Sequence, residues 1–81
     1  MASQNVANDR LAVIRITGMH SFRCEKAIEK ALLVFPGVHE VEVDFLSAQA
    51  SVLYDGQEVN VSQLMSAVSG AGYSPIGCTQ R

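Results

Sequence analysis

The chain has 81 residues, enough for one domain around a single hydrophobic core and too few for two. Its apolar fraction of 48% supports a folded protein, and its net charge of −2 argues against a binder of nucleic acid or anionic lipid, which would carry a basic surface. No stretch is apolar over the length needed to span a membrane, so we expect no direct membrane contact. The two cysteines are too few for the disulfide framework of a small secreted protein, which predicts separate thiols in a cytoplasmic protein.

The N-terminal half begins with a polar stretch, residues 1–10, that lacks the apolar core of a secretory signal and is expected to be a disordered leader. Residues 11–17 are β-branched and partly alternating, which predicts a strand that ends at Gly18. Ser21 is a good N-cap, and we expect its hydroxyl to accept a hydrogen bond from the backbone N–H of Cys24. The helix predicted over residues 22–34 has apolar residues at helical spacing, which places Cys24 on the core-facing stripe.

The C-terminal half contains three further strands and one helix. Pro36-Gly37 ends the first helix, and residues 38–46 alternate apolar with acidic side chains, as a half-buried strand does. A turn at 47–49 leads to a hairpin partner over 50–55. Asn60 and Gln63 form a capping box at the start of a helix that ends near residues 70–72. A short last strand over 73–77 leaves residues 78–81 as a C-terminal tail.

This order of elements predicts an α+β fold, the ferredoxin-like βαββαβ sandwich, in which a four-stranded antiparallel sheet carries two helices on one face. Right-handed crossovers place the first and third strands in the middle of the sheet. The loop after the first strand and the start of the last strand then lie at the same end. We therefore expect Tyr73 to approach the loop at residues 18–24 and Cys78 to be carried away from it.

Cys24 is the principal candidate for chemistry. A cysteine at the start of a helix lies near unpaired backbone N–H groups and the positive end of the helix dipole, and both favour the thiolate. A thiolate is the ligand that soft metal ions prefer, whereas the plainer alternative is a small buried residue. Ordinary catalysis has little support, because the sequence has no Ser-His-Asp spacing, no paired carboxylates and no glycine-rich phosphate loop before a helix.

Several motifs between about residues 11 and 77 resemble the heavy-metal-associated domain family. They are Gly18-Met19-His20-Ser21-x-x-Cys24, Ile28-Glu29-Lys30-Ala31-Leu32, Pro36-Gly37-Val38, Val41-x-Val43, Ala50-x-Val52-x-Tyr54 and Ala71-Gly72-Tyr73. The family includes copper chaperones, the N-terminal domains of copper- and zinc-transporting P-type ATPases, and mercuric ion-binding proteins. The resemblance implies a non-enzymatic domain, free-standing or part of a transporter, that binds Cu(I) in the first instance, with Zn, Cd or Hg as alternatives.

Ser21 departs from the family pattern, which is Gly-Met-x-Cys-x-x-Cys with two metal-binding cysteines. Ser21 replaces the first of them, so Cys24 is the one remaining main ligand; the sequence is compatible with a natural serine and with a deliberate replacement of cysteine. His20, Cys78 or a second molecule are the sources left for another ligand. By the resemblance, Met19 packs beneath the site and Tyr73 stands beside it without binding metal.

Two classes of function follow. The first is a soft-metal binding and transfer domain with a one-cysteine site, whose partner is a metal-transporting ATPase or its soluble chaperone. The second is a metal-free ferredoxin-like module for protein interaction or regulation. A metal- or disulfide-bridged homodimer through Cys24 is a further arrangement, because a lone thiol without a resolving cysteine is limited to mixed disulfides or dimers.

Overall fold

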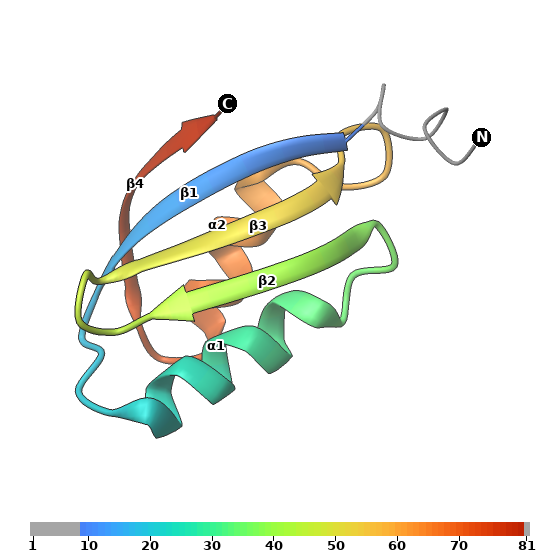
Figure 1. Cartoon of the computed structure of the whole chain (residues 1–81). Helices are drawn as coiled ribbons and strands as arrows, with labels where there is room; N and C mark the ends of the chain where they lie inside the picture. Colours follow the sequence, from blue (N-terminus) through green and yellow to red (C-terminus); the bar gives the residue numbers. More distant parts are fainter. Residues whose placement is uncertain (1–8, 81) are drawn as a thin grey trace.

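A four-stranded antiparallel sheet with two helices packed on one face forms the domain (Figure 1). The computed structural model describes residues 9–80. The elements are β1 (Asp9–Thr17), α1 (Phe22–Leu33), β2 (Val38–Asp44), β3 (Gln49–Asp55), α2 (Val61–Gly70) and β4 (Ser74–Gln80). The strand order is β2-β3-β1-β4, so the predicted ferredoxin-like fold, with the first and third strands in the middle, is confirmed.

The hydrophobic core lies between the sheet and the helices. Each contributing strand buries alternate residues and each helix buries one stripe, as the sequence periodicities predict. Each fully buried valine, leucine or isoleucine side chain stabilises the fold by about 1.5–3 kcal/mol relative to an exposed one. The core comprises Ala12, Ile14, Ile16, Ile28, Leu32, Val38, Ala50, Val52, Tyr54, Val59, Leu64 and Val68.

The last strand is longer than the sequence predicted. β4 continues to Gln80, whereas a strand over 73–77 and a tail from residue 78 were expected. The extension has a physical cause: β1 is nine residues long, and its backbone groups as far back as Ala12 pair with β4, where Ala12 lies opposite Gln80. β1 itself begins at Asp9, inside the segment expected to be a leader, and residues 1–8 of that segment lie outside the described residues.

α2 begins with a capping box and ends where the chain enters the site. The predicted capping box is present, since Asn60 Oδ1 accepts from Gln63 N and Gln63 Oε1 accepts from Asn60 N, both at 2.9 Å. At its other end α2 is terminated by Gly72, whose φ of +99° is a left-handed conformation that favours glycine. Tyr73 follows at once, so its ring is delivered beside the loop between β1 and α1.

Candidate metal centre

The site lies at one end of the sheet, where the loop between β1 and α1, the β2–β3 turn and the start of β4 come together (Figure 1). β1 ends at Thr17, and Gly18 then adopts a φ of +98°, which turns the chain away from the sheet. A Cβ on Gly18 would lie 3.7 Å from Cδ1 of Tyr73, so the loop rests against the tyrosine ring. The predicted approach of Tyr73 to this loop is therefore confirmed.

Ser21 caps α1, but through a different donor from the one expected. Its backbone is extended and its hydroxyl oxygen accepts from Arg23 N at 3.2 Å. The N–H of Cys24 donates instead to the Ser21 carbonyl oxygen at 3.0 Å. The Ser21 carbonyl oxygen thus accepts from the N–H that was predicted to donate to the Ser21 hydroxyl. The hydroxyl accepts instead from the N–H of Arg23, one residue earlier in the chain. Ser21 has a complete structural role at the position where the family pattern has a cysteine.

Cys24 occupies the first turn of α1 and is surrounded by hydrogen-bond donors. The backbone N–H of His20 lies 3.3 Å from Cys24 Sγ. The hydroxyl of Tyr73 donates to the same sulfur, and this contact, followed by the His20 N–H, lowers the pKa of Cys24 from 9.0 to about 7. Desolvation acts in the opposite direction with less effect. The thiolate is therefore favoured, as expected, although the largest cause is the Tyr73 hydroxyl and not the start of the helix.

The pKa of Tyr73 moves the other way. It is raised, first because its hydroxyl donates to Cys24, and further by desolvation and by the negative charge of the thiolate. The two groups therefore form a thiolate–phenol pair in which the tyrosine keeps its proton. Cys24 is partly exposed and outside the buried core, contrary to the core-facing position predicted for it. The reason is that β1 has already ended at Thr17, so the first turn of α1 meets the loop instead of the sheet's centre.

The remaining predicted site residues lie in different environments. Met19 packs against the core beneath the loop, as expected. His20 contacts the Cys24 sulfur through its backbone N–H, and the residue is exposed to solvent. Cys78 lies in β4 opposite Ile14, four residues beyond Ser74, which is roughly 14 Å along a strand. It packs against the core, and burial raises its pKa, so its part in a site with Cys24 stays a prediction.

Two contacts that sequence reasoning missed fasten α1 to the β2–β3 turn. Glu25 Oε2 accepts a hydrogen bond from Phe45 N at 2.8 Å, and the rings of Phe22 and Phe45 meet edge to face with centroids 5.0 Å apart. Phe22 and Leu46 leave 68% and 83% of their surface exposed at this end of the molecule. An acidic residue in the first turn of a helix was the available signal, but it does not reveal a partner 20 residues away.

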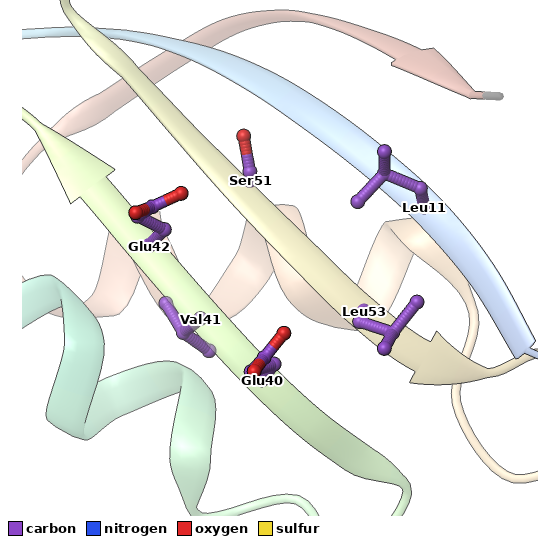
Figure 2. Close-up of a pocket in the computed structure, with 6 residues that line it drawn as sticks. All are labelled: Leu11, Glu40, Val41, Glu42, Ser51 and Leu53. Carbon is purple, nitrogen blue, oxygen red and sulfur yellow. The ribbon is translucent and has the colours of Figure 1, made fainter.

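A shallow hollow of about 250 Å³ lies elsewhere, on the face of the sheet that the helices leave open (Figure 2). Figure 2 shows Glu40 of β2 beside Leu53 of β3, with Leu11 of β1 on the far side of Leu53. Glu42 lies across from Ser51. The lining of the hollow includes no residue of the Cys24 loop and no thiol. Among residues 9–80, no group of three or more His, Cys, Asp or Glu side chains is arranged to hold a metal ion.

The element order and sheet topology define a small domain of the ferredoxin-like class, with a thiol in the first turn of α1. The sequence profile of the heavy-metal-associated domain matches residues 13–74, and the chain belongs to that family. It is 36% identical over 64 residues to the copper chaperone CopZ of Staphylococcus aureus, a match that covers 79% of this chain and 94% of the chaperone.

Solved structures agree with the assignment. A CopZ metallochaperone has a TM-score of 0.80 at 33% identity, with 82% of this chain and 98% of that chain covered. The Cu(I)-loaded N-terminal domain of a potential copper-translocating P-type ATPase from Bacillus subtilis has a TM-score of 0.78 at 33% identity, with 88% and 91% covered. These relatives are chaperones and metal-binding domains. In the described part of this chain, no helix is long and apolar enough to cross a membrane.

Proposed function

We propose that this domain binds one Cu(I) ion through the Cys24 thiolate and passes it to, or receives it from, another cytoplasmic copper protein. The observation that carries the proposal is the environment of Cys24, whose sulfur accepts hydrogen bonds from His20 N–H and the Tyr73 hydroxyl at the start of α1. Cys24 also stands at the position of the second cysteine in the family pattern. A thiolate that is populated at neutral pH binds a soft ion without first losing a proton.

The second ligand comes from the partner. Cu(I) is soft and prefers thiolates, whereas the Ser21 hydroxyl is a hard oxygen that already accepts from Arg23 N. An incoming thiolate of the partner binds Cu(I) beside Cys24, and the bond to Cys24 then breaks, so the ion keeps its charge and its oxidation state. A copper-transporting ATPase or its soluble chaperone would supply such thiolates. A second copy of this chain, bridged through Cys24, is the homodimeric version of the same chemistry.

Titration with Cu(I) against a competing chelator tests the proposal, with Cys24→Ala as the variant and Cys78→Ala as the matched control. We expect binding by the parent and by Cys78→Ala, and its loss in Cys24→Ala. Parallel titrations with Zn²⁺, Cd²⁺ and Hg²⁺ determine which ion the site prefers. Copper binding that survives in Cys24→Ala would contradict the proposal, and a shift to twice the mass on loading would identify the bridged dimer.

A metal-free interaction module is the second candidate, and the specific observation in its favour is Ser21. The serine caps α1 through Arg23 N and so gives the loop a stable structure without any metal. This candidate predicts that the parent and Cys24→Ala give the same weak response in the titration. It also predicts that a copper-transporting partner, if one is captured, binds the two proteins equally.

A further inference from the structure

The contact between Glu25 and Phe45 joins the first turn of α1 to the turn between β2 and β3. Glu25 directly follows Cys24 on the first turn of α1, and its Oε2 accepts from Phe45 N at 2.8 Å in a partly buried hydrogen bond. The edge-to-face contact of Phe22 with Phe45 supports the same junction, with an angle of 84° between the rings. A carboxylate that accepts from a backbone N–H forms one of the stronger hydrogen bonds in proteins.

The turn that receives Glu25 is itself anchored. Ile16 N, near the end of β1, donates to Ala48 O at 2.9 Å, and Leu46 N donates to Asp44 Oδ1 at 3.0 Å within the turn. The first turn of α1 is therefore held to the sheet through the β2–β3 turn by Glu25 and meets Tyr73, from the start of β4, through Cys24.

We propose that Glu25 is a positioning residue for Cys24: its hydrogen bond to Phe45 N holds the first turn of α1 where Cys24 Sγ reaches the His20 N–H and the Tyr73 hydroxyl. The acceptor atom performs this role and the negative charge does not. Without the bond, the first turn keeps its Ser21 cap but is tied to the β2–β3 turn, within residues 9–80, through the exposed Phe22 ring, so Cys24 Sγ is held less firmly. The positioning of Cys24 by Glu25 does not depend on the proposed function; only the expected effect of Glu25 on Cu(I) affinity rests on it.

Three variants separate positioning from general stability, all made in a Cys78→Ala background so that one thiol reacts. Glu25→Ala removes the acceptor, Glu25→Gln keeps an acceptor oxygen without the charge, and Asp44→Ala removes the bond from Leu46 N within the same turn and leaves α1 untouched. The measurement is the rate of alkylation of Cys24 by iodoacetamide across pH 5–10, with urea unfolding of each variant as the check that it is folded.

We expect the midpoint of the profile to rise in Glu25→Ala and to stay near the parent value in Glu25→Gln and Asp44→Ala. A rise of one pH unit makes the thiolate about fivefold scarcer at pH 7. The inference is overturned if the Glu25→Ala profile matches the parent, or if Asp44→Ala moves the midpoint as far.

The copper experiment distinguishes the two proposals. If Cys24 binds Cu(I), the affinity of Glu25→Ala falls several-fold and Glu25→Gln restores it. If the parent binds no copper but the alkylation midpoint of Glu25→Ala rises, Glu25 still positions Cys24 and the proposed function alone is wrong.

Discussion

Cys24 and Cys78 have the same side chain, but their surroundings shift the pKa of the thiol in opposite directions. Cys24 lies in the first turn of α1, where phenol and backbone donors contact its sulfur and lower its pKa to about 7. Cys78 lies in β4 among core side chains, where desolvation raises its pKa. Both are partly exposed. The difference teaches that hydrogen-bond donors at one sulfur and desolvation at the other together decide which thiol of this domain is ready to bind a soft metal.

Ser21→Cys gives the largest expected effect, because it adds a second thiolate at the start of the same helix. We expect the Cu(I) affinity to rise by more than about 100-fold, which exceeds the 10–100-fold effect typical of residues that only support a ligand. Loss of the serine cap costs about 1 kcal/mol of stability in the apo protein. Chelator competition measures the first change and urea unfolding the second.

The control for this variant is Ser21→Cys combined with Cys24→Ala, which has one thiolate moved by three positions. Its affinity should fall back to that of a one-thiolate site. If Ser21→Cys binds Cu(I) no more tightly than the parent, position 21 is not a ligand position in this chain. The family pattern would then not describe the metal ligands of this chain at position 21.

Alkylation of the unaltered chain measures the difference between the two thiols directly. At pH 7 we expect Cys24 to react with iodoacetamide about tenfold faster than Cys78, because its larger thiolate fraction outweighs the lower nucleophilicity of a low-pKa thiolate. Mass spectrometry of proteolytic fragments gives both rates in one sample. Equal rates would mean that the donors around Cys24 do not favour its thiolate in solution.

The position of the site could be predicted from the sequence because it depends on local signals and on topology. Gly18 and Ser21 mark the end of a strand and the start of a helix by their own chemistry. The βαββαβ order then brings Tyr73 to the same end of the sheet, since handedness leaves one arrangement of the crossovers. Met19 followed from the pattern as a residue packed beneath the loop.

The details that failed depend on partners distant in the chain. Cys78 was assigned to a tail, whereas the length of β1 supplies a pairing edge that keeps it in β4. Glu25 was given no partner, because the helical periodicity of the sequence carries no information about the backbone N–H of Phe45. Whether Arg23 N or Cys24 N donates to the Ser21 hydroxyl is a choice between neighbouring donors that differ by little free energy, and only the folded geometry selects between them.

Tyr73→Phe gives the smallest effect, and its sign follows from linkage. The folded pKa of Cys24 lies below its ordinary value of 9.0, so the unfolded chain binds more protons than the folded chain between about pH 7 and 9. The free energy of unfolding therefore rises with pH in that window, and the contribution is lost as pH falls through about 7. Removing the hydroxyl removes the largest cause of the shift, so the rise should flatten in Tyr73→Phe.

Urea unfolding of the reduced protein at pH 6, 7, 8 and 9 measures this slope, with Cys24→Ala as the control that has no thiol to titrate at this position. We expect the slope to be largest in the parent, smaller in Tyr73→Phe and smallest in Cys24→Ala. The window stops at pH 9 because the raised pKa of Tyr73 acts in the opposite direction, stabilising the fold below the ordinary tyrosine pKa and losing that contribution as pH rises further. A parent slope equal to that of Cys24→Ala would show that Cys24 titrates alike in the folded and unfolded chains, and would leave its position at the helix start without an electrostatic consequence.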